Sequence, residues 1–385
     1  MTTRDAAETV LRAWNRYEID RGAPPIIDYD CYPSSEEIPA LPNRLDALRQ
    51  LTALKESATA AGDIALATRL DAHIAYCSAL LGERESLEWY VSRTQGSVPT
   101  GWSEEYLTAR RDLAIDMMDR VGVGWGPDTA DDLAAAEGIL SPDELAGAIR
   151  DAAAEYEPAV REATGTTAPY ELDILTVDED AYWSYWLDGV GRRARLRMNR
   201  RRARYTKVAT RQFALHEILG HALQFASIAD RCATEDVPWI RLFSVHTPSQ
   251  TLFEGLAQAL PLFVAADDEQ LIARVRLDHY QQLVRAKLHI ALAAEVPILE
   301  IADQARRWVP FWTDTQISDL MTDRSADVLL RSYLWSYPAG CDWFVRLADT
   351  KGAPARRILH AVYRAPHTPA ELMALWPEGP AIGGE

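Results

Sequence analysis

Apolar residues recur at intervals of three and four along most of this chain, a spacing that favours one buried face of an α-helix. The pattern is interrupted by short stretches rich in Gly, Pro or Ser, which indicate turns and loops. We therefore expect a mainly α protein. The predicted helices cover residues 6–19, 43–60, 64–81, 104–120, 130–136, 142–163, 206–229, 248–265 and 267–294, with shorter helices up to residue 376.

The middle of the chain follows another pattern, in which β-branched and aromatic residues gather and apolar positions alternate with polar ones. This pattern predicts three strands, over residues 170–177, 181–187 and 193–199, with a tight turn at Asp188-Gly189. The strands would form a small β-sheet beside the helix that starts near Thr206.

At 385 residues and 48% hydrophobic content, the chain can bury a large core. The change of pattern near residue 165 predicts a helical N-terminal lobe over residues 1–165. A second part, over residues 166–385, would hold the sheet and a helical C-terminal portion. We expect two helical lobes around a deep cleft.

The net charge of −17 at pH 7 disfavours nucleic acids and anionic membranes as partners. No apolar run approaches the roughly 20 residues that span a membrane, and the first residues lack the basic and apolar regions of a secretory signal. We therefore expect a cytoplasmic protein. The widely separated cysteines favour reduced, structural thiols at Cys31, Cys77, Cys232 and Cys341.

The main candidate for chemistry is the hexapeptide His216-Glu217-Ile218-Leu219-Gly220-His221. Its two imidazoles and the carboxylate of Glu254, from a later helix, form an open three-ligand set of the kind that holds a catalytic zinc ion. Residues five apart lie about 140° from each other around a regular α-helix, against about 40° for residues four apart. An i→i+5 turn brings them onto one face. We therefore predict a π-bulge between His216 and His221, where Gly220 lowers the steric cost of reshaping the helix.

The surroundings favour a metal site over two ordinary buried histidines. Both the histidine helix and the helix of Glu254 are otherwise apolar, and a polar group buried there is costly unless it is hydrogen-bonded or ligated. Residues 195–199 form a short strand just before the histidine helix. Zinc peptidases show the same order, with an edge strand that borders the cleft and aligns the substrate.

The His-Glu-x-x-x-His motif followed by Glu254-Gly255-Leu256-Ala257 resembles the tyrosine carboxypeptidase family, which includes microtubule-associated enzymes and bacterial proteins named for a Gln-Glu-Gly-Leu-Ala motif. Phe253 stands where that motif has Gln. The stretch from Met198 to Gln224 is also similar to a bacterial family with His-Glu-x-x-Pro-Gly-His, with one residue deleted and no proline. The resemblance spans about residues 195–260. It implies a zincin-like fold of the gluzincin type and a zinc metallopeptidase, with a lean toward carboxypeptidase.

Under this hypothesis, one Zn²⁺ binds His216, His221 and Glu254, and a water with its pKa lowered to about 7 fills the fourth position. Glu217 takes a proton from this water as general base and later delivers one to the leaving amine. An alternative ligand set replaces Glu254 with His246. A further donor should stabilise the oxyanion. The candidates for this donor are Tyr333, Tyr337, Arg331 and His246.

Eight arginines lie between Arg192 and Arg204 in an otherwise acidic chain. On the strand over residues 193–199, three of them share one face. One interpretation is a solvated or acid-paired surface. In the other, Arg195 and Arg197 line the cleft and bind a carboxylate. The expected substrate is a peptide or small amide, with a free carboxylate under the second interpretation.

The sequence leaves two other functions open. Two histidines and one carboxylate also hold the iron of non-haem oxygenases, although such sites need no acid at the position of Glu217. A non-catalytic helical interaction module could keep the same residues as a structural metal site. The identity of the bound metal and the effect of Glu217→Gln separate these functions from hydrolysis.

Overall fold

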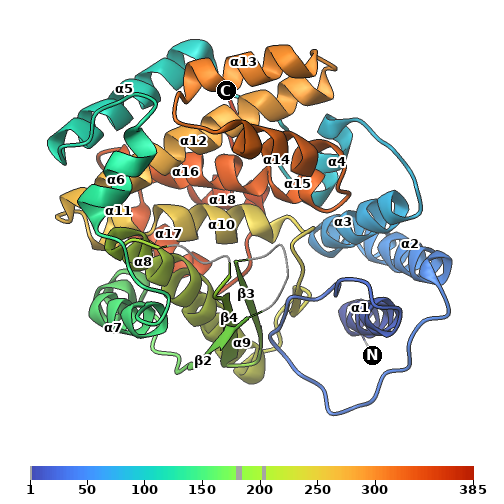
Figure 1. The fold of residues 1–385 in the computed structure, drawn as a ribbon. Coiled ribbons are helices and arrows are strands. Elements are labelled where there is room, and N and C mark those ends of the chain that lie inside the picture. The colour runs from blue at the N-terminus through green and yellow to red at the C-terminus, as the bar shows by residue number, and fades with distance from the viewer. Residues whose placement is uncertain (1, 179–183, 202–204) are drawn as a thin grey trace.

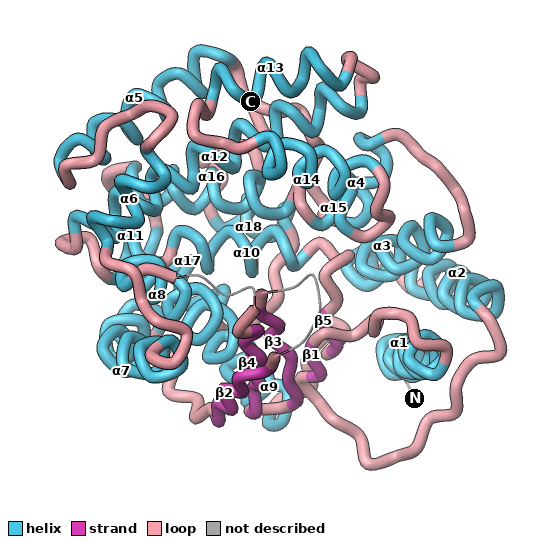
Figure 2. The backbone as a smooth tube through the Cα atoms, viewed as in Figure 1, coloured by secondary structure: helices cyan, strands magenta, loops and turns pink. Residues whose placement is uncertain are grey.

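The computed structural model describes residues 2–178, 184–201 and 205–385. Helices make up most of this part of the chain, and the strands are confined to one small region (Figure 2). The prediction of a mainly α protein with a small sheet is confirmed. The helices before the main strands are α1 (Thr3–Asp20), α2 (Arg44–Ala60), α3 (Ile64–Leu80), α4 (Leu87–Thr94), α5 (Glu104–Arg120), α6 (Thr129–Glu137) and α7 (Leu145–Thr164).

Short polar side chains start several of these helices. Asn43, Asp63, Ser86 and Ser103 each accept a hydrogen bond from the backbone amide three residues later, which satisfies one of the free amides at a helix start. Helix α5 has the predicted bounds. Helix α4 was not predicted, because its eight residues are too few to show a clear helical period.

The described strands form one mixed sheet in the order β2-β4-β3-β1-β5. Strands β2 and β4 are parallel, β3 and β4 are antiparallel, and β1 is parallel to β3 and antiparallel to β5. Strands β1 and β5 were not predicted, because strands of two residues are too short to show an alternating pattern. The strand bounds are Tyr29–Asp30 for β1, Glu171–Val177 for β2, Tyr185–Val190 for β3, Arg193–Asn199 for β4 and Leu242–Phe243 for β5.

The predicted turn at Asp188-Gly189 is wrong, because both residues lie inside β3. Gly189 is needed there for a different reason: a Cβ atom on it would lie 2.3 Å from the ring of Tyr29 on the neighbouring strand. The chain reverses instead at Gly191, whose φ of 59° favours glycine. Residues 181–183 of the predicted second strand lie outside the described residues.

The second half of the chain supplies the helices through the centre of the molecule, among them α10, α12 and α16, while the sheet lies toward one edge (Figure 1). Helix α10 packs against both η1 and α16. The bounds of the helices in this half are α8 (Lys207–Phe213), η1 (Ala214–Ala222), α9 (Leu223–Thr234), α10 (Ser249–Ala259), α11 (Pro261–Val264), α12 (Glu269–Ala293), α13 (Ile298–Trp308), α14 (Asp314–Ser325), α15 (Leu330–Tyr333), α16 (Ser336–Asp349), α17 (Ala355–Val362) and α18 (Pro369–Leu375).

Glycines allow α10 to touch both of these helices closely. A Cβ atom on Gly340 of α16 would lie 1.9 Å from the carbonyl oxygen of Thr251, and one on Gly255 would lie 2.3 Å from the carbonyl carbon of Gly340. On the η1 side, a Cβ atom on Gly220 would lie 2.8 Å from the Cβ atom of Ala257. The small residues that follow Glu254 therefore fix α10 between two helices.

We expect Gly340→Ala to lower the free energy of unfolding by about 1–3 kcal/mol, because its methyl group cannot share space with the Thr251 carbonyl and the helices must separate. Gly147→Ala in α7 is the matched control. Nothing lies within 4 Å of a Cβ atom there, and alanine favours a helix interior by about 1 kcal/mol over glycine. Chemical denaturation measures both variants. If Gly340→Ala is as stable as wild type, the close contact between Gly340 and the Thr251 carbonyl does not contribute to stability.

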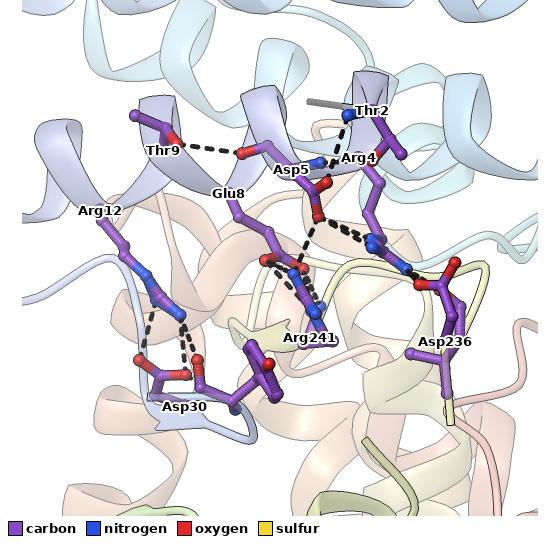
Figure 3. A network of polar contacts seen from close by, with 11 residues as sticks. Thr2, Arg4, Asp5, Glu8, Thr9, Arg12, Asp30, Asp236 and Arg241 are labelled. Carbon is purple, nitrogen blue, oxygen red and sulfur yellow. Dashed lines mark hydrogen bonds and ion pairs between the residues drawn. The ribbon is translucent and has the colours of Figure 1, made fainter. Parts of the chain in front are cut away.

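Ion pairs hold α1 against the segments next to the sheet, as Figure 3 shows. Arg12 of α1 pairs with Asp30 at 2.9 Å, and Arg241, just before β5, pairs with Glu8 at 2.6 Å. The Glu8 and Arg241 side chains are largely buried. Removal of one partner from such a pair leaves a buried charge without compensation. The N-terminal helix is therefore fixed to both short strands of the sheet.

One large hydrophobic core joins the two predicted parts of the chain. It includes Val91 and Ile149 before residue 165, and Leu215 and Phe253 after it. The predicted division near residue 165 therefore crosses a shared core, and as a domain boundary it stays a prediction. All four cysteines are buried and unpaired. Of the helices described, none combines the length and the apolar character that crossing a membrane requires.

Candidate metal centre

The segment that carries both histidines is a π-helix. Element η1 continues α8 and leads directly into α9, so it forms the middle of one helical rod. Its wider turn places residues five apart on one face. The Nε2 atoms of His216 and His221 lie 3.2 Å apart, with the two rings perpendicular. The predicted π-distortion between the histidines is confirmed.

Helix α10 brings Glu254 to the same point. Its Oε2 atom lies 3.4 Å from His216 Nε2 and 3.7 Å from His221 Nε2. Glu254 is only 5% exposed, and within the described part of the chain Oε2 has no hydrogen-bond partner. Burial raises the pKa of this carboxyl, but the imidazoles of His221 and His216 outweigh burial and hold the pKa well below its usual range. Glu254 is therefore an ionised acceptor aimed at two imidazole nitrogens.

These three atoms have the spacing of ligands around a single ion. Zinc bonds of about 2.0–2.1 Å at tetrahedral angles place ligand atoms about 3.3 Å apart. A cation between them would satisfy the buried oxygen of Glu254. One feature departs from a typical site: His221 Nδ1 has no partner among the described residues, whereas ligating imidazoles usually donate their second N–H. His216, His221 and Glu254 otherwise fit a divalent metal.

Glu217 lies next to this set and is an alternative third ligand. One of its oxygens is 3.5 Å from His216 Nε2, and ligand atoms of His216, Glu217 and His221 lie within 4.8 Å of one another. Glu254 fits better because its Oε2 approaches both imidazoles within 3.7 Å. Glu217 instead lines a hollow of about 240 Å³ together with His216. Burial raises the pKa of Glu217 to about 7, and the charge of His216 opposes this shift.

Tyr333 and Tyr337 reach the site from α15 and α16, so the structure brings both predicted tyrosines to it. The Tyr333 hydroxyl donates to Glu254 Oε1 at 2.6 Å and lies 2.7 Å from the Tyr337 hydroxyl. Burial raises the pKa of both phenols well above the usual value, so both keep their protons. Tyr337 also lines the hollow beside Glu217. Tyr333 thus orients the carboxylate, while Tyr337 faces the open space.

We expect Tyr333→Phe to weaken zinc binding by roughly 10–100-fold, the usual effect of losing a group that orients a metal ligand. The matched control is Tyr280→Phe, which removes a tyrosine hydroxyl that donates to the Trp308 carbonyl at 2.7 Å and should leave zinc affinity unchanged. Competition with a coloured chelator measures the affinity of both variants. Equal affinity in Tyr333→Phe and wild type would argue against Glu254 as a ligand held by this tyrosine.

Arg195 and Arg197 do not line the hollow beside His216. The alternate residues of β4, such as Leu196, face the core, so the arginines project from the opposite face of the sheet. Both pair with Asp188 of β3, at 3.0 Å and 2.7 Å, and both line a different hollow of about 790 Å³. The structure therefore shows the acid-paired arrangement and does not bring these arginines to the metal centre.

His246 and Arg331 also lie apart from this hollow. His246 Nε2 is 2.9 Å from His73 Nδ1, and its ring stacks on Tyr76 at 4.1 Å between centroids. Arg331 donates to the backbone carbonyl of Glu85 at 2.7 Å. Both side chains already have partners elsewhere. The structure therefore does not bring either residue to the site as an oxyanion donor, and it does not place His246 beside the other ligands.

Several residues that line the hollow beside His216 and Glu217 were not predicted from the sequence. Tyr185 of β3 lines this hollow beside Glu217, and its ring lies edge-on to Phe213. No local pattern distinguishes such a tyrosine from any other strand residue. A signal did exist on α12, where three polar residues lie four and three positions apart and so share one helical face. These residues are Asp278, Gln282 and Arg285, which all line the hollow.

Comparison with known proteins does not assign the chain to a family. The chain matches no protein-family model, and a search of curated proteins finds none that resembles it. The resemblance of residues 195–260 to the tyrosine carboxypeptidase family therefore rests on its motifs, and the argument for a metal rests on the geometry of His216, His221 and Glu254.

Proposed function

We propose that this protein hydrolyses peptide or small amide bonds with one Zn²⁺ held by His216, His221 and Glu254. The observation that carries the proposal is the convergence of three candidate ligand atoms 3.2–3.7 Å apart, one of them a buried oxygen with no hydrogen-bond partner among the described residues. The π-helix beside a small sheet supports a zincin-like fold of the gluzincin type. The lean toward carboxypeptidase comes from the motif resemblance.

The residues around the ion have distinct roles in this proposal. When bound, the ion supplies an acidified water and polarises the substrate carbonyl. Glu217 lines the hollow beside Tyr185, so it can take a proton and return it to the leaving amine. The Tyr337 hydroxyl keeps its proton and donates it to the Tyr333 oxygen in this structure; turned into the hollow, it can donate to the oxygen that gains charge. Tyr333 keeps Glu254 in position.

The two alternative functions are a non-haem iron oxygenase and a non-catalytic module with a structural metal site. A facial iron site uses the same set of two histidines and one carboxylate, but it needs no acid at the position of Glu217 beside the first ligand. A structural site is usually closed by four protein ligands. The hollow next to His216 and Glu217 favours an open, catalytic site over that arrangement.

The experiment that tests this function measures bound metal and cleavage in one preparation. The protein is purified without added metal, its zinc and iron are determined by mass spectrometry, and it is incubated with a mixed library of short peptides. We expect zinc and a progressive release of amino acids from peptide ends. Iron with oxygen-dependent turnover would replace hydrolysis with oxidation. Bound metal with no cleavage of any library member would favour a non-catalytic module.

A further inference from the structure

A second hollow, of about 320 Å³, adjoins the one beside the metal centre. Gln282, Arg285 and Tyr337 line both hollows, so the two meet at these side chains. The second hollow lies between α12 and α14 and contains Arg324 of α14 and Trp312. A substrate at the metal centre could therefore extend past Tyr337 into this space.

Two guanidiniums in the second hollow have no acid partner in the described part of the chain. Arg324 is 7% exposed, and its Nη1 atom donates to the Leu320 carbonyl at 3.4 Å. The Arg285 guanidinium lies 5.5 Å from the ring centroid of Trp312. Across residues 2–178, 184–201 and 205–385, no carboxylate oxygen lies within 4.0 Å of either guanidinium. Arg274, in the neighbouring hollow, by contrast pairs with Glu137 at 2.7 Å.

The charges around these arginines do not compensate them fully. Burial and repulsion from Arg285 lower the pKa of Arg324 to about 9, and Asp323 opposes this shift. Burial also lowers the pKa of Arg285 against the opposing charge of Asp278. Asp319 and Asp323 line the same hollow without forming an ion pair with either arginine. Two neighbouring cations, Arg324 buried and Arg285 half-buried, are costly unless an anion binds them.

We propose that Arg285 and Arg324 form an anion-binding subsite that takes a carboxylate of the substrate. Planar guanidiniums match the two oxygens of a carboxylate, and partial burial strengthens the contact. The substrate would be an amide whose carboxylate lies past Tyr337 while its scissile bond lies at His216 and Glu217. This placement rests on the proposed function, whereas the binding of a carboxylate by the two arginines does not.

The test measures thermal unfolding in the presence of N-acetyl-trialanine with a free carboxylate, or of the same peptide as its C-terminal amide. We expect the carboxylate form, and not the amide, to raise the Tm of wild type. Arg285→Gln and Arg324→Gln should each abolish this rise. Because neither arginine is paired with an acid, the Tm of each variant without peptide should stay at the wild-type value or increase.

Arg274→Gln is the matched control, because it removes an arginine of the adjoining hollow that does pair with a buried acid. We expect it to lower the Tm and to keep the carboxylate-dependent rise. The subsite is refuted if wild type shows no rise specific to the carboxylate, or if the rise survives in both Arg285→Gln and Arg324→Gln. A fall in the Tm of unliganded Arg324→Gln as large as that of Arg274→Gln would also contradict it.

Release of alanine from the same peptide, measured in parallel, tests the proposed function separately. A carboxylate-specific rise in Tm without hydrolysis by the zinc-loaded protein would leave the subsite intact and count against the peptidase. Hydrolysis without such a rise would support the peptidase and remove the subsite.

Discussion

Glu217→Gln lowers the kcat of peptide hydrolysis by roughly 10²–10⁴-fold in the proposed mechanism, which is the usual contribution of a general base. Glutamine keeps the size of the side chain but cannot accept a proton from water at neutral pH. The bound zinc should stay at the wild-type level, because Glu254 and not Glu217 approaches both imidazoles within 3.7 Å. Turnover at saturating peptide and metal content are measured on the same zinc-loaded sample.

The same substitution at an exposed acid of α7, Glu162→Gln, is the control and should leave kcat unchanged. Two results would contradict the role of Glu217. One is a wild-type rate in Glu217→Gln with full zinc content. The other is a loss of rate that follows a loss of zinc, which would make Glu217 a metal ligand.

The second large effect is expected on zinc affinity, when the carboxylate of the proposed ligand Glu254 is removed. We expect Glu254→Ala to weaken zinc binding by more than the 10–100-fold that a supporting residue is typically worth. Zinc at about 100 times its Kd should stabilise wild type by about 2.7 kcal/mol, because it binds the folded chain. That gain should disappear in Glu254→Ala and in His221→Ala. Thermal unfolding with zinc and with a chelator measures the gain in each variant.

Glu217→Gln serves as the internal control for this measurement and should show the full zinc-dependent gain. The opposite outcome, in which Glu254→Ala keeps the gain and Glu217→Gln loses it, would exchange the roles of the two carboxylates. If both Glu254→Ala and Glu217→Gln keep the zinc-dependent stabilisation, the ion binds elsewhere in the molecule.

The local chemistry of the site could be predicted from the sequence. The five-residue spacing of His216 and His221 is incompatible with one face of an α-helix, so a π-helix follows from the assumption that both bind one ion. Glu254 was found because an acid in an apolar helix needs a partner. Of the four candidate donors, the structure brings Tyr333 and Tyr337 to Glu254, and their role there stays a prediction.

Features that depend on packing between distant segments could not be predicted from the sequence. The acid that pairs with Arg195 and Arg197 is Asp188, which was assigned to a turn because Gly189 follows it. Nothing local shows that this glycine accommodates the ring of Tyr29 on a neighbouring strand. In the same way, the partner of His246 is a histidine from α3, and no periodicity connects the two.

The motif after Glu254 gains a physical meaning only in the folded chain. Gly255 lies against Gly340 of α16, and Ala257 lies against Gly220 of η1. The same short segment therefore carries the proposed ligand Glu254 and sets the distance between the helices that carry the two histidines and Tyr337. The sequence shows the glycines, whereas their contacts appear only after α10 is placed between its neighbours.

The most direct test of the account is anomalous diffraction at the zinc absorption edge from crystals of the zinc-loaded protein. If zinc binds as proposed, one strong peak lies within about 2.0–2.2 Å of His216 Nε2, His221 Nε2 and Glu254 Oε2, with Glu217 outside bonding distance. A fully zinc-loaded crystal with no peak between these atoms, or with the peak bonded to other residues, would contradict it.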